Sequence, residues 1–108
     1  MRTDRGLHEA AAVVLSAGAW SKAMAANLGV KPPLDTERGY HLMLPQPEKG
    51  LSRPTVNGDA GFVLSPMAEG LRLASGVEFA GLEAPANFSR IRALLPLAKR
   101  MQIGRAHV

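Results

Sequence analysis

The sequence predicts an α+β fold, in which the edge of an α/β domain is followed by a mostly antiparallel sheet flanked by helices. Three observations predict it. A short apolar run, residues 11–15, passes through a glycine turn into a segment of helical periodicity. Residues 39–79 hold short apolar stretches separated by glycine, proline and asparagine, a pattern typical of strands and turns. A second helical pattern covers residues 87–98.

The first part of the chain predicts a strand, a glycine turn and a helix. Residues 2–7 indicate a short strand that runs into a turn, and residues 11–15 indicate a strand buried on both faces, because no polar residue interrupts them. From Ala19 onward, apolar residues fall at helical spacing. Gly29 stands where a left-handed helix end belongs, and a Pro-Pro pair follows. The apolar residues of this helix are Trp20, Ala23, Met24 and Leu28.

Short strands are expected through the middle of the chain. Asn57-Gly58-Asp59 is a strong hairpin signal between two of them. Ser75-Gly76 interrupts two alternating stretches and predicts a bulge. The expected strands cover residues 39–44, 55–56, 61–64, 71–73 and 77–79, with a loop at 47–50.

The last predicted helix begins after Asn87, whose side chain suits an N-cap. Pro96 removes a backbone donor, so we expect the helix to kink or split there. The apolar face of this helix consists of Phe88, Ile91, Leu94, Leu95 and Ala98.

Composition narrows the function classes. The 108 residues suffice for one small domain. The net charge is +4, but the basic residues are scattered among acidic ones and do not alternate with aromatics, so no nucleic-acid partner is expected. Without cysteine the chain has neither disulfides nor thiolate ligands, and His8, His41 and His107 share no ligand spacing. We therefore expect no metal site.

The chain shows no signal for the membrane. Its longest apolar run, residues 10–15, is far too short to cross a bilayer, and the N-terminus lacks the apolar core of a signal peptide. We expect a cytoplasmic protein.

The sequence does not supply enough neighbouring elements to bury the predicted strand at residues 11–15. A strand that is apolar on both faces needs neighbours and covering layers, and a single short strand precedes residues 11–15. We expect residues 2–29 to be the edge of a larger α/β domain supplied by further sequence.

The C-terminal residues point the same way. Ile103-Gly104-Arg105-Ala106-His107-Val108 resembles the translation of a common sequencing adapter, and Gln102 fits the same frame. We therefore expect the native sequence of this chain to end at about Met101, with 102–108 a non-native tail.

Three segments carry a family resemblance. They are Val13-Val14-Leu15-Ser16-Ala17-Gly18-Ala19-Trp20-Ser21, the stretch from Pro33 through Arg38-Gly39-Tyr40 to His41, and the stretch from Ser65 to Leu82. In this order and spacing, over residues 8–101, they resemble FAD-dependent oxidoreductases of the D-amino-acid oxidase superfamily, in the form of its D-amino-acid dehydrogenase-like members. The resemblance implies a partial FAD-binding domain at 1–30 and a partial substrate domain at 31–101.

The resemblance places Ala17, Gly18 and Trp20 near the flavin nucleotide. Physical reasons agree, because a glycine lets backbone approach a cofactor closely and the helix that follows presents N–H groups at its start. The alternative stays open: strand–glycine–helix joins are common, and an aromatic residue at helical spacing often belongs to a core.

The resemblance also gives Arg38 and Tyr40 a substrate-side role. Arginine pairs with the carboxylate of a small zwitterion, and a tyrosine hydroxyl suits its other end. In a regular strand both share one face and His41 takes the other, where a structural role is expected. The alternative is a surface arginine and a core-edge tyrosine. Arg72 and Glu78 are expected on solvated faces or as a weak pair.

The implied activity is oxidation of the C–N bond of a small amino acid, of D configuration, by hydride transfer to flavin, as in amino-acid catabolism. The imino acid formed would hydrolyse to a keto acid. The electron acceptor, oxygen or a membrane quinone pool that would imply a peripheral membrane link, stays open, as does the oligomeric state. The G-x-G-x-x-G fingerprint and the later Arg-Pro and Asp-Gly region of these enzymes lie outside this chain, so we expect residues 1–108 alone to be inactive.

Two alternatives remain. Ser16 lies on a strand-to-helix turn as a hydrolase nucleophile does, but Val14 occupies the position where that motif requires glycine. The second alternative is a complete small α+β domain with a binding or structural role and no catalytic activity.

Overall fold

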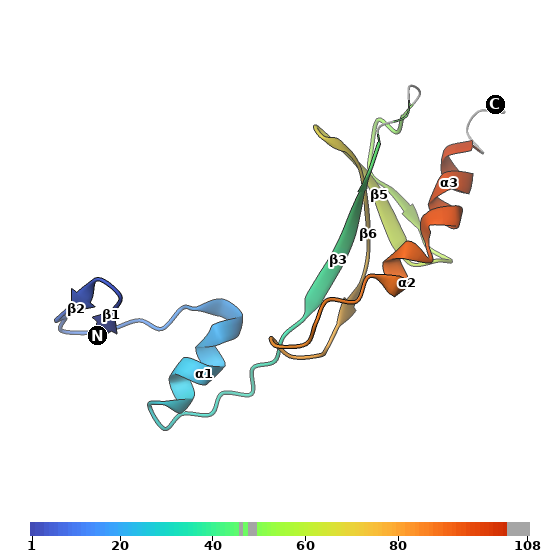
Figure 1. Ribbon diagram of the computed structural model, residues 1–108. Coiled ribbons are helices and arrows are strands. Elements are labelled where there is room, and N and C mark those ends of the chain that lie inside the picture. Colours follow the sequence, from blue (N-terminus) through green and yellow to red (C-terminus); the bar gives the residue numbers. More distant parts are fainter. Residues whose placement is uncertain (46, 48–49, 104–108) are drawn as a thin grey trace. The chain divides into compact units, whose positions relative to one another are not determined.

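The structure is a computed structural model that describes residues 1–45, 47 and 50–103. The chain forms two compact units, residues 1–36 and 37–108 (Figure 1). The predicted loop at 47–50 and the predicted tail at 102–108 lie largely outside the described residues. The assignment of either unit to a domain of a flavoenzyme stays a prediction.

The first unit opens with a small hairpin. β1 (Arg2–Thr3) pairs with β2 (Gly6–Leu7) in antiparallel register, Arg2 opposite Leu7 and Thr3 opposite Gly6. The Thr3 hydroxyl donates to the Gly6 carbonyl oxygen and accepts from the Arg5 N–H, each at 3.2 Å. The expected strand and turn are confirmed, and a second strand follows the turn.

The predicted buried strand at residues 11–15 is wrong. These residues form no strand, and the exposed fractions are 63% for Val13 and 86% for Val14. The physical reason is the lack of a partner: β1 and β2 pair with each other over their short lengths, and neither forms a ladder with residues 11–15. Apolar composition indicates a preference for burial but cannot supply the hydrogen bonds of a neighbouring strand.

The predicted helix is present. A 3₁₀ turn, η1 (Gly18–Trp20), leads into α1 (Ser21–Ala26). The helix ends at Ala26, and Gly29 is the left-handed residue of the turn that follows, with φ +77° as expected. The Gly29 N–H donates to the Ala26 carbonyl (3.0 Å), and the Val30 N–H donates to the Ala25 carbonyl (3.1 Å).

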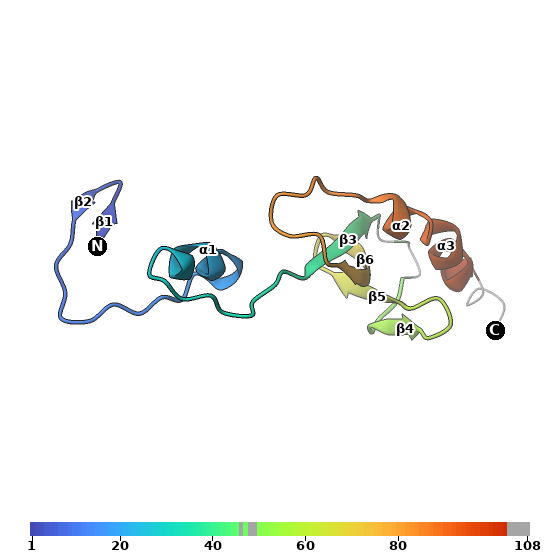
Figure 2. The same ribbon diagram turned by 90° about the horizontal axis from the view of Figure 1, so that it is seen from below.

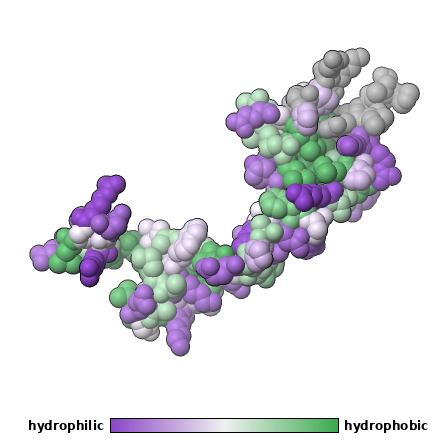
Figure 3. Space-filling view, in the orientation of Figure 1, coloured by the Kyte–Doolittle hydropathy of each residue, from purple (hydrophilic) through white to green (hydrophobic). Residues whose placement is uncertain are grey.

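The apolar face of this helix is not covered within its own unit. Ala25 is the buried residue of residues 1–36, whereas Trp20, Met24 and Leu28 are exposed. In the space-filling view, apolar and polar residues lie side by side on the surface of this unit (Figure 3).

The second unit is built on a four-stranded sheet. Its strands are β3 (Arg38–Leu44), β4 (Thr55–Asn57), β5 (Phe62–Met67) and β6 (Gly70–Glu78). Their spatial order is β3-β6-β5-β4, with every neighbouring pair antiparallel (Figure 2). The prediction of an α+β fold with a mostly antiparallel sheet is confirmed.

The hairpin between β4 and β5 is confirmed, with a longer turn than the Asn-Gly pair alone requires. Asn57 pairs with Phe62, so residues 58–61 form the turn. The Asn57 side-chain oxygen accepts from the Ala60 N–H, and its carbonyl accepts from the Gly61 N–H, both at 2.9 Å. Local side-chain to backbone bonding of this kind favours asparagine in turns.

The predicted bulge is also confirmed. Gly39 lies opposite Val77, but the next residue of β3, Tyr40, lies opposite Ser75. Gly76 is therefore the extra residue of β6, and its φ of +61° is a conformation that glycine adopts readily.

Two helices cover one face of the sheet, α2 (Ser89–Arg92) and α3 (Leu95–Ile103) (Figures 1 and 2). Alternate residues of β5 and β6 point to this face, as period-two strands require. The core consists of Leu51, Phe62, Leu64, Leu71, Leu73, Ile91 and Ala98.

The start and the interruption of the last helical segment follow the sequence. The Asn87 side-chain oxygen accepts from the Ser89 N–H at 3.0 Å, and Pro96 falls in the first turn of α3, where its missing N–H costs nothing. The expected split is confirmed. The N-cap position is Phe88 and not Asn87, which binds the first helical N–H from one residue earlier. No helix among the described residues is long and apolar enough to cross a membrane.

Candidate functional site

A pocket of about 180 Å³ lies between the bulge of β6 and the start of α2. Strand β3 contributes one wall, and the turn between β4 and β5 closes one side. The lining includes apolar residues, uncharged polar residues, one acidic residue and one basic residue. The lining residues are Tyr40, Ala60, Ser75, Gly76, Val77, Glu78, Asn87, Arg90, Ile91 and Leu94.

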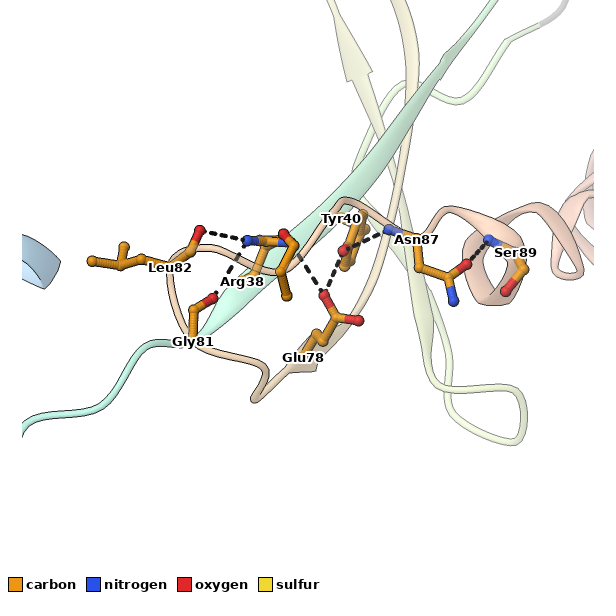
Figure 4. Close-up of polar contacts among 8 residues, drawn as sticks. Arg38, Tyr40, Glu78, Gly81, Leu82, Asn87 and Ser89 are labelled. Atoms are coloured by element: carbon orange, nitrogen blue, oxygen red, sulfur yellow. Dashed lines mark hydrogen bonds and ion pairs between the residues drawn. The ribbon is translucent and has the colours of Figure 1, made fainter.

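Tyr40 is held at both ends. Its hydroxyl donates to Glu78 Oε2 at 2.5 Å and accepts from the backbone N–H of Asn87 at 3.0 Å (Figure 4). Its ring meets the Phe88 ring edge to face, with centroids 5.1 Å apart and planes at 79°. The phenol therefore links strand β3, strand β6 and the segment that enters α2.

Arg38 fastens the loop that follows β6. Nη1 donates to the Ala84 carbonyl at 2.7 Å, and Nη2 donates to the carbonyls of Leu82 at 3.2 Å and Gly81 at 3.4 Å. Nη1 also lies 3.5 Å from Glu78 Oε2, with the two side chains 27% and 29% exposed. At that exposure the ion pair contributes modestly, so the carbonyl bonds do most of the anchoring.

The structure brings the predicted substrate residues together around a third residue. Arg38 and Tyr40 lie on one face of β3, and both contact the same oxygen of Glu78 (Figure 4). In this arrangement the guanidinium is directed at backbone carbonyls and Glu78. Their role toward a substrate stays a prediction.

The expectation for Glu78 was wrong. It is neither on a solvated face nor paired with Arg72, because the bulge at Gly76 changes the alternation of β6. Without the extra residue, Glu78 and Arg72 would share a face. With it, Glu78 turns to the face of Tyr40. The bulge that the sequence predicted was the signal for this position.

Arg90 and Asn87 were missed as pocket residues. Arg90 lies on α2, next to buried Ile91; it is an exposed residue and one of those that line the pocket. In the described part of the chain, the ion pair at this site is that of Arg38 with Glu78, and none involves Arg90. No sequence motif marks these residues, since their place depends on how α2 packs on the sheet. His41 is exposed on the opposite face of β3.

The predicted cofactor residues lie in the first unit and differ in accessibility. The Ala17 N–H is used within the chain, donating to the Ser21 hydroxyl at 2.9 Å. Gly18 has φ +56°, and no atom lies within 4 Å of the position a Cβ would take. Trp20 is 64% exposed. The Gly18 backbone and the Trp20 ring therefore fit contact with a nucleotide, whereas the Ala17 N–H does not.

The described residues offer no metal centre. No group of three or more histidine, aspartate or glutamate side chains among them lies close enough together to hold an ion.

Comparison with known proteins adds to this geometry. Residues 2–108 match the family described as FAD dependent oxidoreductase. The chain is 44% identical over 92 residues to a D-amino-acid oxidase of Bradyrhizobium diazoefficiens, which covers 85% of this chain and 22% of that protein. It is 30% identical over 96 residues to an uncharacterized oxidoreductase in the pyp 5′ region of Halorhodospira halophila, covering 87% of this chain and 44% of that protein.

The chain thus spans less than half the length of either relative. No solved structure matches it. Because the family match covers nearly every residue and a relative with 44% identity agrees with it, the chain belongs to the FAD-dependent oxidoreductases.

Proposed function

We propose that this chain is part of an enzyme that oxidises the C–N bond of a small amino acid of D configuration. The product is an imino acid, which hydrolyses to the keto acid. The observation that carries the proposal is the 44% identity over 92 residues to a protein named D-amino-acid oxidase. The pocket is compatible with it, since Glu78 and Arg90 are among the residues that line a space of about 180 Å³. Cytoplasmic location and a role in amino-acid catabolism remain part of the proposal.

FAD would supply the hydride acceptor in such an enzyme. On the cofactor side, we propose that the Gly18 backbone and the Trp20 ring lie against the nucleotide, because both are accessible. Ala17 would contribute through its position in the turn. Residues 1–108 contain no G-x-G-x-x-G fingerprint, so binding needs residues beyond those that this chain supplies. We therefore propose that the 108-residue chain alone is inactive.

On the substrate side, the role proposed for this chain's residues is to orient the substrate, not to exchange protons with it. Tyr40 lines the pocket and holds Glu78 by the 2.5 Å hydrogen bond. Arg38 acts through Glu78 and through the loop at residues 81–84. Fixing groups in advance lowers the entropic cost of positioning a substrate.

The test uses a chimera. The 92-residue matching segment of the Bradyrhizobium D-amino-acid oxidase is replaced by that of this chain, and keto-acid release is measured with D- and L-amino acids, and with 2-hydroxy acids as controls. The proposal predicts keto acid from D-amino acids. A chimera that retains FAD and unfolds like the parent oxidase, yet yields no keto acid from any amino acid, would contradict it.

Replacement of Tyr40 by phenylalanine in the chimera separates the substrate side from the cofactor side. Tyr40→Phe removes the hydroxyl that fixes Glu78 and keeps the ring against Phe88. We expect kcat/KM for the amino acid to fall roughly tenfold, the effect of one charge-assisted hydrogen bond, with FAD content unchanged. His41→Ala, on the opposite face of β3, is the matched control and should change neither. Equal loss of activity and FAD in Tyr40→Phe would contradict the substrate-side role.

A further inference from the structure

We infer that Asn57 is a site of spontaneous deamidation, and that the fold of the β4–β5 turn and the docking of α3 slow the reaction there. The Asn-Gly pair that predicts the hairpin also has a reactivity of its own, because asparagine is a chemically labile residue. This site lies outside the FAD and substrate chemistry and does not depend on the proposed function.

The reaction needs no partner except water. The backbone nitrogen of Gly58 forms a bond to Cγ of Asn57, the bond from Cγ to Nδ2 breaks, and ammonia leaves with the proton of the Gly58 nitrogen. Water then opens the resulting succinimide ring at either carbonyl, which leaves aspartate or isoaspartate at position 57. No oxidant or reductant takes part.

Gly58 presents its nitrogen without obstruction. Glycine has no Cβ beside the attacking atom, Gly58 is exposed, and nothing lies within 4 Å of the place that a Cβ would take. Among the residues that the structure describes, none accepts a hydrogen bond from the Gly58 N–H. The two other asparagines of the chain precede bulky residues, Leu28 and Phe88, whose side chains crowd the attacking nitrogen.

The fold holds the Asn57 carboxamide in one orientation. Its Oδ1 accepts from the Ala60 N–H at 2.9 Å, so Nδ2 lies on the other side, where it donates to Met101 Sδ on α3 at 3.4 Å. The backbone is fixed as well, since Asn57 pairs with Phe62 and its carbonyl accepts from the Gly61 N–H at 2.9 Å. An extended strand carries the side chain away from the following nitrogen. Closing the ring therefore requires these bonds to break first.

Conversion of Asn57 removes the contact between α3 and the turn. Carboxylate oxygens accept but do not donate, so an aspartate at position 57 has no donor for Met101 Sδ. Isoaspartate adds a methylene group to the backbone opposite Phe62, which is 1% exposed in the core. Ala60, which the same side chain holds, lines the pocket. Deamidation thus loosens the turn beside the pocket.

The test follows the conversion of each asparagine with time in the full 108-residue chain, kept in mildly alkaline buffer with and without guanidinium chloride. Peptide mass spectrometry measures each site. We expect Asn57 to convert at least roughly tenfold more slowly in the folded chain than in denaturant, and faster than Asn27 and Asn87 in denaturant. Equal rates for Asn57 in both buffers, or equal rates for the three asparagines in denaturant, would overturn the inference. If the isolated chain does not unfold cooperatively, the chimera that retains FAD is the folded sample.

Matched variants separate the chemistry from the fold. Gly58→Ala adds a Cβ in open space at a position without a positive φ, so the turn should form while conversion in denaturant falls at least roughly tenfold. Met101→Leu keeps the apolar contact but removes the sulfur acceptor, and conversion in the folded chain should rise roughly threefold. Met67→Leu, at an exposed position of β5, is its control and should leave the rate unchanged. An unchanged rate in Gly58→Ala, or equal rates in the two leucine variants, would contradict the mechanism.

Asn57→Asp reproduces the aspartate product. Its unfolding midpoint in urea should lie below that of the parent chain, because the bond to Met101 is lost. Met101→Leu should then lower the midpoint less in Asn57→Asp than in the parent, since residues that share one bond are not additive. Equal shifts in both backgrounds would show that deamidation does not act through α3.

Discussion

The strand and the face on which Arg38 lies were predicted correctly, but its hydrogen-bond and ion-pair partners were not. The alternation of β3 puts Arg38 and Tyr40 on one face, as the sequence predicted. The identity of their partner could not be read from that alternation, because Glu78 reaches this face through the bulge at Gly76. The loop carbonyls that Arg38 holds belong to residues 81–84, which follow β6, and the alternation of β3 does not reveal them. The place of Arg90 at the pocket was not predicted for a similar reason, because it depends on how α2 packs on the sheet.

Arg38→Lys tests the anchoring role. Lysine keeps the charge beside Glu78 but lacks the planar fork that reaches the carbonyls of Ala84 and Leu82. We expect the free energy of unfolding to fall by about 1–2 kcal/mol, measured by urea denaturation of the full chain. Arg72→Lys, at an exposed position of the neighbouring strand, is the control and should change little. Equal loss in both variants would show that the carbonyl bonds contribute nothing.

The elements that the sequence predicted best are those whose signals are local. The left-handed turn at Gly29, the bond from the Ser89 N–H to the Asn87 side chain, the split near Pro96 and the bulge at Gly76 each depend on one residue's backbone preference or side-chain oxygen. The strand expected at residues 11–15 failed because a strand depends on a partner elsewhere. The apolar run that contains Val13 and Val14 indicates a preference for burial. It does not show whether a neighbouring strand is available to form hydrogen bonds with it.

Gly76→Ala tests whether the bulge needs a left-handed residue. No atom lies within 4 Å of the added Cβ, so the cost comes from the φ of +61° alone. We expect a loss of roughly 1 kcal/mol in unfolding free energy, and a smaller loss for Gly76→Asn, because asparagine tolerates this conformation. Gly39→Ala, opposite Val77 and also open, lacks a positive φ and should be neutral or slightly stabilising. Thermal unfolding of the variants measures these changes. Equal changes at Gly76 and Gly39 would show that the positive φ of Gly76 is not the source of the cost.

At the scale of the whole molecule, the two units differ in how much they bury. Residues 37–108 contain the sheet and its core, whereas residues 1–36 bury Ala25 and expose Val14 and Trp20. The family match runs through both units, over residues 2–108. The fold class and the family could be predicted from the sequence, because they rest on motifs in order along the chain. The pocket could not, since it combines residues 40, 78 and 90 from two strands and a helix.

The measurement that tests the proposed function most directly is flavin reduction by the chimera in the absence of oxygen. This step does not depend on whether oxygen or a quinone later accepts the electrons. With FAD bound, mixing with a D-amino acid should bleach the visible flavin absorbance, and the L-enantiomer should leave it unchanged. Persistence of the absorbance with every amino acid, while the parent Bradyrhizobium oxidase is bleached under the same conditions, would contradict the account.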